Sequence, residues 1–257
     1  MIGRDAPTLA ELAEDTAVFL LPRPTFETVE RNGFVFVAGT FNGWVHRVRL
    51  GDVEAAVTWA RAEGRARGLR EIEWWLGWST TPADAGERLL AAGLVPDADA
   101  PVLSGMTCRV APPDVPAIEV RRVTTLAEYQ AALDVDWRVW QIDEEEQDRR
   151  RASEIARWEP MRDSGVVHHF SAFLEGERVG FGRAIDLAGG VALMGGAVLP
   201  EARGHGVYRA LVHARWQHAA GRGTPLLVVQ AGHMSRPVLE RLGFECHGEL
   251  HLYSDRL

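Results

Sequence analysis

The first half of the chain alternates short apolar runs with one amphipathic segment. Within residues 52–67 the apolar positions recur every three or four residues, which places them on one face of a helix, and Gly68 follows as a helix-ending glycine. Runs of β-branched and aromatic residues predict strands around this helix. The expected strands are 34–38, 44–50, 71–78 and 104–110, and a second, short helix is expected at 82–92.

The second half shows the same alternation with longer elements. A hairpin is expected to turn at Glu175-Gly176-Glu177, between two apolar runs. The strands predicted in this half are 118–123, 168–174, 178–187, 191–199, 226–230 and 249–253, and the helices are 125–140, 144–161, 204–220 and 235–242.

A proline-rich segment separates the two halves. Residues 111–117 contain three prolines, which cannot continue a helix or a central strand. We therefore expect an interdomain linker here, with one domain over residues 1–112 and another over 113–257.

The two halves also share a faint internal echo. In each, a helix is followed by Arg-Gly, a strand and a helix that begins with proline. Arg67-Gly68 precedes Pro82 by the same spacing at which Arg222-Gly223 precedes Pro237. This echo favours a duplicated domain over coincidence.

The most informative stretch is the loop that joins the third strand of the second half to the following helix. An apolar strand stops at Pro200, and a tight turn containing Gly204 and Gly206 leads directly into a helix. The first N–H groups of a helix have no intrahelical partner and carry the positive end of its dipole, and glycines let a phosphate approach them. Arg203 and Arg209 add side-chain charge, so the loop is predicted to bind an anion.

Two common phosphate-binding motifs do not fit this loop. The third glycine of a dinucleotide-binding fingerprint is missing, and no Gly-Lys-Ser/Thr follows as a P-loop requires. From the loop alone, an ordinary strand–loop–helix joint with a glycine turn stays an equal alternative.

With its surroundings included, the loop resembles that of the Gcn5-related N-acetyltransferase (GNAT) family. The acyl-CoA loop of that family has the pattern Gln/Arg-x-x-Gly-x-Gly/Ala, which falls on residues 201–206 here with Glu201 in the first place. The order of elements that follows, with a helix closing in Leu-Gly-Phe244, is also similar. The resemblance covers residue 118 to the C-terminus, and it reaches the first half only through the echo.

This resemblance implies an α/β (α+β) fold with two GNAT-like domains, each a mixed, mostly antiparallel sheet flanked by helices. The domain at 1–112 would be a degenerate copy, because it has no Arg-Gly-x-Gly before its long helix. The domain at 113–257 would bind acetyl-CoA, or another acyl-CoA, as a co-substrate without a metal.

The resemblance also implies how CoA would bind. The pyrophosphate would contact the loop amides, the pantetheine arm would pair with residues 195–199 like an extra strand, and a backbone N–H near Ala197 or Val198 would polarise the thioester carbonyl. The residues expected to contact CoA are Ala197, Val198, Leu199, Arg203, Gly204, His205, Gly206, Val207, Tyr208 and Arg209.

The usual acid and base positions of the family are blank in this chain. Many members carry a tyrosine four residues before the Gly-Phe pair and an asparagine seven residues earlier, where this chain has Leu239 and Gly232. The catalytic candidates are His233 and Glu145, the latter in the acidic run 143–148. The competing interpretations are a loop histidine without a role and a helix N-terminus enriched in acid.

Four other residues are secondary candidates. His168 and His169 are adjacent on a strand, so only one of them faces inward. Tyr208 and Tyr253 each carry a phenol that can protonate a thiolate, although Tyr208 is also placed to pack beside CoA.

Composition limits the classes of partner. The chain has 257 residues, of which 46% are hydrophobic and 25% charged, and every one of its 28 basic residues is arginine. A net charge of −8 offers no basic footprint for nucleic acid, and its sign mildly favours cationic acceptors. Cys108 and Cys246 are expected to be buried free thiols. No signal peptide and no apolar membrane span is visible, so we expect a cytoplasmic protein that binds neither membranes nor nucleic acid.

These observations favour an acyl-CoA-dependent N-acyltransferase (acetyltransferase) that modifies the amine of a small-molecule or peptide acceptor. The blank acid and base positions support an alternative, an acyl-CoA-binding sensor or regulatory protein without turnover. A third interpretation, a duplicated fold with an unused loop, fits the Arg203-Gly-His-Gly206 sequence poorly.

Overall fold

The computed structural model describes residues 6–257, and its first half contains the strands and the long helix that the sequence pattern predicts. The long helix begins where the Asp52 side chain accepts a hydrogen bond from the Ala55 N–H (2.9 Å), and it buries the apolar face of the amphipathic segment. The elements of this half are α1 (Leu9–Glu14), α2 (Thr16–Phe19), β1 (Glu27–Arg31), β2 (Phe34–Ala38), β3 (Asn42–His46), α3 (Val53–Ala66), β4 (Glu71–Leu76), α4 (Ala85–Ala91), β5 (Val95–Pro96) and β6 (Val102–Cys108).

The second half also follows the predicted order of elements. Its first helix is fixed by a capping box, in which the Thr125 side chain accepts from the Glu128 N–H and the Glu128 carboxylate accepts from the Thr125 N–H. The elements are β7 (Glu119–Arg122), α5 (Leu126–Val139), α6 (Glu144–Asp163), β8 (Val167–Leu174), β9 (Glu177–Leu187), β10 (Gly190–Val198), the 3-10 turn η1 (Pro200–Ala202), α7 (Val207–Gly221), β11 (Leu227–Ala231), α8 (Arg236–Arg241) and β12 (Glu245–Arg256).

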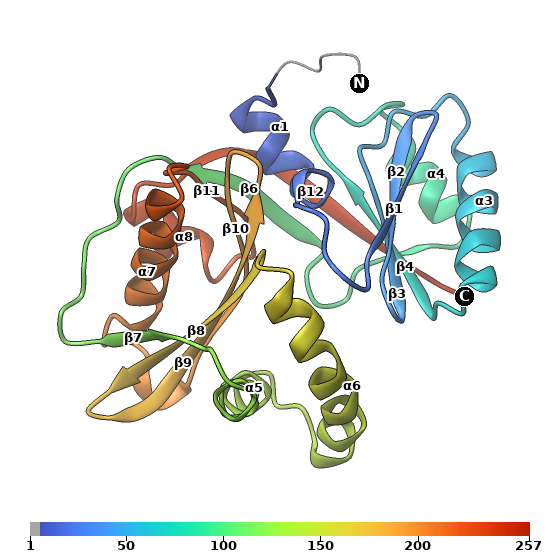
Figure 1. The fold of residues 1–257 in the computed structure, drawn as a ribbon. Helices are drawn as coiled ribbons and strands as arrows, with labels where there is room; N and C mark the ends of the chain where they lie inside the picture. The colour runs from blue at the N-terminus through green and yellow to red at the C-terminus, as the bar shows by residue number, and fades with distance from the viewer. Residues whose placement is uncertain (1–5) are drawn as a thin grey trace.

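All twelve strands of the described residues 6–257 belong to one continuous sheet. Its order is β1-β2-β3-β4-β12-β6-β11-β10-β9-β8-β7, and β5 pairs with β12 beside this path (Figure 1). Within residues 6–257, only the β3–β4 and β10–β11 pairs are parallel. The expected mixed, mostly antiparallel architecture flanked by helices is thus confirmed, and the sheets of the two halves are joined.

The sheets are joined because the halves exchange strands. β6 belongs to the first half in sequence, yet it lies between β11 and β12. β12 belongs to the second half; its Glu245–His251 part pairs with β6, and its continuation to Arg256 pairs with β4. The division at residue 112 stays a prediction about the sequence, and strands cross it in space in both directions.

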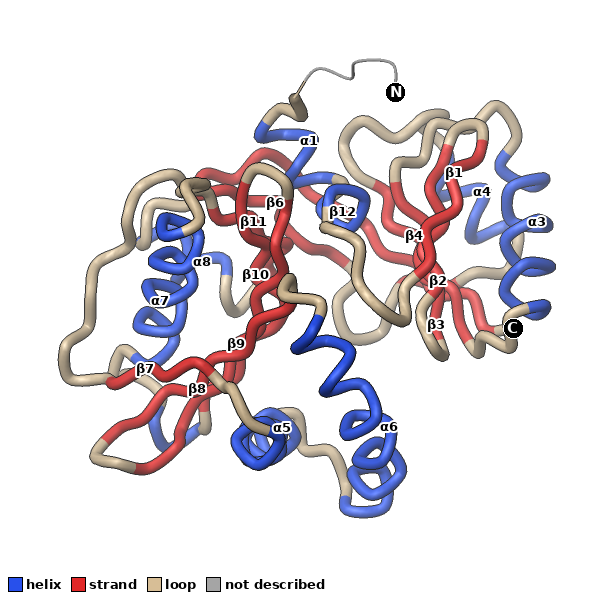
Figure 2. Tube along the Cα trace, viewed as in Figure 1, coloured by secondary structure: helices blue, strands red, loops and turns tan. Residues whose placement is uncertain are grey.

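Helices cover the sheet of the second half on both faces. Figures 1 and 2 show α7 and α8 on one side of β8, β9 and β10, and α5 and α6 on the other. Along β9 the side-chain directions agree: a Cβ on Gly180 would meet Val207 of α7, whereas Phe181 stacks on His169 beside α5. In the first half, α3 and α4 lie together beside β1 to β4 in the same views.

The sequence pattern did not indicate the two short N-terminal helices. Thr8 caps α1 through a capping box, and Leu12 packs between the halves on Leu187 and Val228. The buried Glu14 carboxylate accepts hydrogen bonds from the Ser79 N–H (2.7 Å) and hydroxyl (2.5 Å). Short helices that cover a strand exchange depend on tertiary contacts, so a single six-residue run carries little periodic signal.

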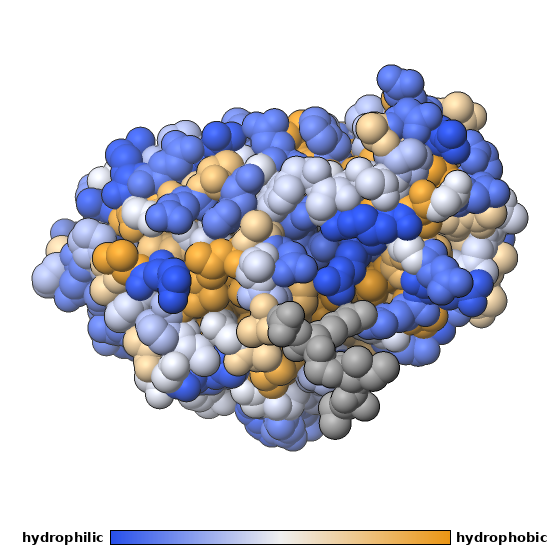
Figure 3. All heavy atoms as spheres, turned by 90° about the horizontal axis from the view of Figure 1, so that it is seen from above, coloured by the Kyte–Doolittle hydropathy of each residue, from blue (hydrophilic) through white to orange (hydrophobic). Residues whose placement is uncertain are grey.

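The two cysteines differ in their exposure. Cys108 is buried as expected, but Cys246 is exposed, because the first residues of β12 face solvent. Outside the grey residues, the face in Figure 3 has only small hydrophobic areas interrupted by hydrophilic ones. Among the helices of residues 6–257, none has both the length and the apolar content needed to cross a bilayer.

Candidate functional site

Two neighbouring strands separate in front of the glycine loop. β10 pairs with β11 only at Val191 and Ala192, whereas its pairing with β9 continues to Val198. Beyond Ala192, the edge of β10 that faces β11 therefore carries backbone groups with no strand partner in the described residues. An extended ligand can form main-chain hydrogen bonds along such an edge.

The register shows which amides face this open edge. The Leu199 N–H donates to the Val179 carbonyl of the β9 side (2.9 Å). Backbone directions alternate along a strand, so Ala197 also points to β9, while Val198 and Gly196 point to the open edge. A bulge between Leu193 and Gly196 precedes these residues. Of the two amides that the sequence offered for the thioester carbonyl, the geometry favours Val198.

The loop itself has the backbone that the sequence predicted. Gly204 and Gly206 have φ values of +84° and +88°, and Gly206 is the N-cap of α7 without any side-chain cap. No acidic residue lies in the first turn of α7, and Arg203, His205 and Arg209 are exposed around it. The first amides of a fifteen-residue helix are therefore uncapped by side chains and surrounded by positive charge.

Three further residues of the predicted site are buried. Val207 is buried and anchors the start of α7, and Leu199 is buried at the end of β10. Ala197 is buried as well, and its side chain is in the core of the second half's sheet. These three contribute backbone or packing to the loop rather than exposed side chains.

Tyr208 extends from the first turn of α7 beneath the open edge. Its ring lies against Gly196, where an added Cβ would be 3.1 Å from the Tyr208 Cε2. Its hydroxyl is hydrogen-bonded to the side chain of Ser235, whose Oγ lies 3.2 Å from the Gly232 carbonyl oxygen. Burial raises the pKa of Tyr208 above its ordinary value, and the charge of Arg215 partly opposes this.

A buried arginine supports the bulge from the same face. Arg215 is 1% exposed; its Nη1 donates to the carbonyls of Gly195 (3.0 Å) and Arg183 (3.2 Å). Its Nε donates to the Leu211 carbonyl (2.9 Å), and its Nη2 has no partner within residues 6–257. Burial lowers the pKa of Arg215 to about 10, so the group stays charged at neutral pH. Sequence analysis did not single out this residue, because arginines are mostly exposed.

The opposite face of the sheet carries a second group of titratable residues. The Arg183 Nε donates to the His169 Nε2 (3.3 Å), and the His169 ring lies 4.8 Å from the Tyr129 ring. The Tyr129 hydroxyl donates to Glu154 (2.7 Å). Burial raises the pKa of Asp136 above its usual range, and the charge of Arg183 opposes that shift. Perturbed carboxyl groups beside a cationic partner are typical of functional sites.

The two catalytic candidates from the sequence lie apart from each other. His233 is exposed in the turn between β11 and α8, two residues before Ser235. Glu145 is exposed in the first turn of α6, whose start lies at the bottom of Figure 1, away from β10. There Asp143 caps the helix by accepting from the Glu146 N–H (2.8 Å), as expected of an acidic helix N-terminus.

Three of the secondary candidates, Tyr253, His168 and His169, lie in different surroundings. Tyr253 lies in the first half, where a Cβ on Gly86 would meet its hydroxyl at 2.5 Å, so it is far from the loop. His168 donates from Nε2 to Asp186 (3.0 Å) and is buried. His169 is the residue that faces Arg183.

One cluster in residues 6–257 has the spacing of a metal site. The ligand atoms of His168, Asp186 and His218 all lie within 4.8 Å of one another. Arg222 Nε is 3.1 Å from the Asp186 carboxylate, and Arg122 contacts the His168 Nδ1. Two guanidinium groups already balance the one carboxylate, so the arrangement fits a buried ion network better than a cation site.

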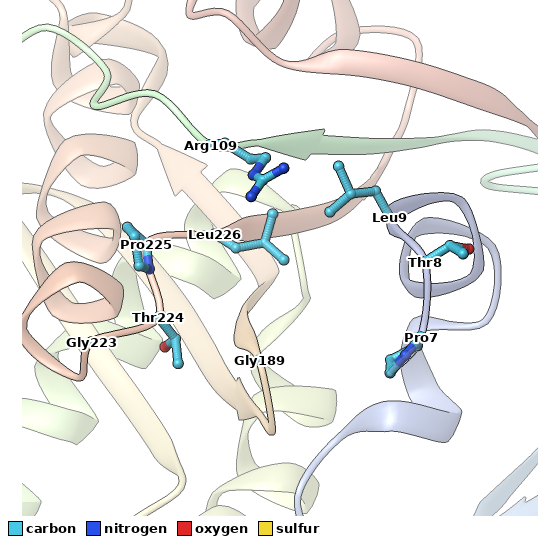
Figure 4. Close-up of a pocket in the computed structure, with 9 residues that line it drawn as sticks. All are labelled: Pro7, Thr8, Leu9, Arg109, Gly189, Gly223, Thr224, Pro225 and Leu226. Atoms are coloured by element: carbon cyan, nitrogen blue, oxygen red, sulfur yellow. The ribbon is translucent and has the colours of Figure 1, made fainter. Parts of the chain in front are cut away.

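A hollow of about 590 Å³ lies at the other end of α7. Its lining includes Leu9, Arg109 and Gly223, as Figure 4 shows. α7 is 15 residues long, which corresponds to about 22 Å. The hollow is therefore separate from the loop at the start of this helix.

Comparison with known proteins connects this geometry to one family. Residues 129–244 match the model of the acetyltransferase (GNAT) family. Among solved structures, a tandem GNAT protein from the clavulanic acid biosynthesis pathway is 17% identical with a TM-score of 0.62, covering 98% of this chain and 89% of that chain. A GCN5-related N-acetyltransferase from Kribbella flavida is 14% identical with a TM-score of 0.67, covering 96% and 95%.

A third structure agrees with these two. A GCN5-related N-acetyltransferase from Sphaerobacter thermophilus is 14% identical with a TM-score of 0.59, covering 87% of this chain and 80% of that chain. At such identities the likeness to solved structures is one of fold. Among curated proteins, none has a matching sequence.

Proposed function

We propose that this protein is an acyl-CoA-dependent N-acyltransferase. The premise is that residues 129–244 form a GNAT-family acetyltransferase domain in a chain with the tandem GNAT fold. It transfers an acetyl or other short acyl group from CoA to the amine of a small-molecule or peptide acceptor. The observation that carries the proposal is the uncapped start of α7 directly beside the open edge of β10.

In this proposal the pyrophosphate of acetyl-CoA binds the amides after Gly204, with Arg203 and Arg209 beside it. The pantetheine arm then runs along the open edge of β10, which brings the thioester toward the bulge before Gly196. The Val198 N–H donates to the thioester oxygen and stabilises the negative charge that develops there. Exposed loop residues, including His205, border the phosphate end.

The chemical step needs two proton transfers. The neutral amine attacks the thioester carbon, the C–S bond breaks, and CoA leaves as a thiolate. We assign protonation of the thiolate to Tyr208, whose ring lies on Gly196. We assign the proton released by the amine to Asp136, which has a raised pKa and lies on the α5 face. His233 and Glu145 remain the sequence-based candidates for the same role.

The alternative function, an acyl-CoA-binding sensor or regulatory protein without turnover, is less well supported. It rested on blank acid and base positions, and Tyr208 supplies a phenol from a different helix. An acyl-CoA sensor would bind acetyl-CoA equally well and release no thiol with any amine.

The test of the co-substrate site compares two glycines of matched geometry. Gly204 and Gly223 both have a positive φ, +84° and +77°, and neither would bring an added Cβ within 4 Å of another group. Alanine at either position costs about 1 kcal/mol or more of backbone strain. Only Gly204→Ala is expected to weaken the binding of acetyl-CoA, by at least about tenfold in the dissociation constant measured by calorimetry. Failure of the parent protein to bind acetyl-CoA, or an equal loss in Gly223→Ala, would refute the proposed site.

A further inference from the structure

Arg183 projects from β9 toward the face on which an acceptor would approach. A Cβ on the preceding Gly182 would meet the Arg215 guanidinium (3.2 Å to Cζ), so Gly182 faces α7 and its neighbour Arg183 faces α5. Gly182 pairs with Gly196, and Ala184 pairs with Leu193 across the β10 bulge. Arg183 therefore lies beside the bulge to which the proposed co-substrate site directs its thioester.

Within the part of the chain that the structure describes, the Arg183 side chain makes one hydrogen bond, and its Cζ lies 6.0 Å from the centre of the Phe181 ring. Its Nε donates to the Nε2 of His169 (3.3 Å), which is 3% exposed and lies between the rings of Tyr129 and Phe181. Burial lowers the pKa of His169 to about 2, so the ring stays neutral and keeps its acceptor nitrogen. No carboxylate in residues 6–257 forms an ion pair with Arg183, and its two Nη groups are left for another partner.

A second guanidinium, that of Arg23, comes from a first-half segment that runs beside β9, and the charge of Arg183 acts on it. The segment after α2 joins β9 through a bridge between Leu20 and Leu187 and a bond from the Leu21 N–H to the Asp186 carbonyl (3.0 Å). Arg23 follows, with its Cζ 3.9 Å from the centre of the Phe26 ring. Its pKa is lowered to about 10 by burial and by the charge of Arg183, and it has no ion pair among the described residues.

Two unpaired guanidinium groups in one partly buried place oppose folding. Like charges repel, and a desolvated charge without a counter-ion is costly. The nearby carboxyl of Asp136 feels the charge of Arg183 but forms no ion pair with it within 4.0 Å. An anion that binds both groups would remove this cost.

We propose that Arg183 and Arg23 bind the carboxylate of the acceptor, so that the acceptor is an amine that carries a carboxylate, in the chemical class of amino acids. This assignment rests on the proposed function. The amine end lies toward Asp136 and the carboxylate end toward the two guanidinium groups. The local positive charge thus reverses the expectation of cationic acceptors that the net charge of −8 suggested.

The test uses two matched libraries of amines with acetyl-CoA as the acyl donor. One contains free α- and ω-amino acids and dipeptides, and the other contains the same compounds with each carboxylate replaced by a carboxamide. Thiol release reports transfer, and comparison of amino acids with dipeptides distinguishes a free amino acid from a peptide. Calorimetric titration of acetyl-CoA into the same protein is measured first.

We expect at least one acid to be acetylated with a kcat/KM at least about tenfold above that of its amide, because charge-assisted hydrogen bonds contribute that much or more. Arg183→Gln and Arg23→Gln should each raise the KM for the acid about tenfold or more and leave the amide unchanged. Arg183→Lys should restore part of the loss. Arg178→Gln is the control, because Arg178 is another partly buried arginine of β9 at the hairpin end.

Several results would overturn the assignment. Amides or polycationic amines accepted as well as the acids would do so, as would an equal loss for acid and amide in Arg183→Gln. Transfer to none of the acids by a protein that binds acetyl-CoA would also overturn it. A protein that does not bind acetyl-CoA at all would instead refute the proposed function, and an unchanged melting temperature and acetyl-CoA affinity in Arg183→Gln exclude misfolding as the cause of its loss.

Discussion

Arg215 and Gly196 are in contact beneath the bulge of β10, with the Arg215 Nη2 3.7 Å from the position that a Gly196 Cβ would occupy. The same guanidinium holds the Gly195 and Arg183 carbonyls by hydrogen bonds of 3.0 and 3.2 Å. A buried charge therefore fixes the strand at the place where the proposed reaction occurs. Such preorganisation is expected to affect catalysis as well as stability.

Arg215→Met tests both effects, because methionine keeps much of the apolar stem and removes the donors. Unpartnered buried carbonyls should lower the free energy of unfolding by about 1–3 kcal/mol, measured by urea denaturation. The kcat should fall as well, because the bulge can relax. Arg222→Met is the control: Arg222 donates to the Gly190 carbonyl (3.1 Å) at the far end of α7. A kcat that is equally reduced in both variants would mean that Arg215 acts only through stability.

Tyr208→Phe tests the assigned proton donor, because it keeps the ring on Gly196 and removes only the hydroxyl. A lost general acid lowers kcat by about 10²–10⁴-fold, and the affinity for acetyl-CoA should stay the same. The raised pKa of Tyr208 keeps the phenol protonated at neutral pH, so deprotonation of this group should lower kcat on the alkaline side. The control is Tyr253→Phe, whose hydroxyl lies beside Gly86 in the first half. Unchanged kcat in Tyr208→Phe would remove Tyr208 from the mechanism.

The sequence predicted the parts of the site that depend on local pattern. Gly204 and Gly206 are recognisable because a positive φ and a close phosphate both favour glycine, and both have the expected backbone. The helices and strands around them followed from hydrophobic periodicity. Long-range pairing has no such signal, so nothing in residues 102–108 or 245–256 indicated that these strands change sides.

The directions of individual side chains could not be predicted from the sequence either. Arg183 and Arg215 are two of 28 basic residues in the composition. The partial burial of Arg183 and the full burial of Arg215 become visible only when β9 and α7 pack together. The acidic run at 143–148 was conspicuous in sequence, yet it forms an exposed helix start. Asp136, the base that we propose, has no comparable signal in the sequence, and Glu145 stays a prediction.

The strand exchange predicts that the halves do not fold separately. Without residues 1–112, β11 loses its partner β6, and the buried Met106 and Thr107 leave the sheet. Residues 113–257 expressed alone should therefore aggregate or lack a cooperative thermal transition, as judged by circular dichroism. Co-expression of 1–112 with 113–257 should restore a folded complex, because each supplies the strand that the other lacks.

Deletion of residues 252–257 examines the reverse exchange with a smaller change. It removes Leu252 and Asp255, which are 3% exposed, and the ion pair of Asp255 with Arg61 (2.8 Å). The first half should lose its protection from hydrogen exchange before the second half does. A fragment of 113–257 that folds alone with a sharp transition would show that the exchanged strands are dispensable.

Burial of His46 predicts a measurable pH dependence of stability. His46 is 2% exposed, its Nδ1 has no partner within residues 6–257, and burial together with the charge of Arg23 lowers its pKa from 6.5 to about 3. The unfolded chain therefore binds this proton more readily than the folded one. The contribution of His46 to the free energy of unfolding is complete above pH 6.5. It declines by about 1.4 kcal/mol per pH unit as the pH falls toward 3.

His46→Phe isolates this contribution from groups of the opposite sign. Burial raises the pKa of Asp15 to about 6 and of Glu73 to about 7, so these carboxyls gain protons in the folded state and offset the loss on acidification. Subtracting the parent's unfolding free energy from that of His46→Phe cancels them. The difference should grow by about 3 kcal/mol in favour of the variant between pH 7 and pH 4. A difference that is the same at every pH would mean that phenylalanine changes only the packing, and that the ring of His46 accepts its proton in the folded protein.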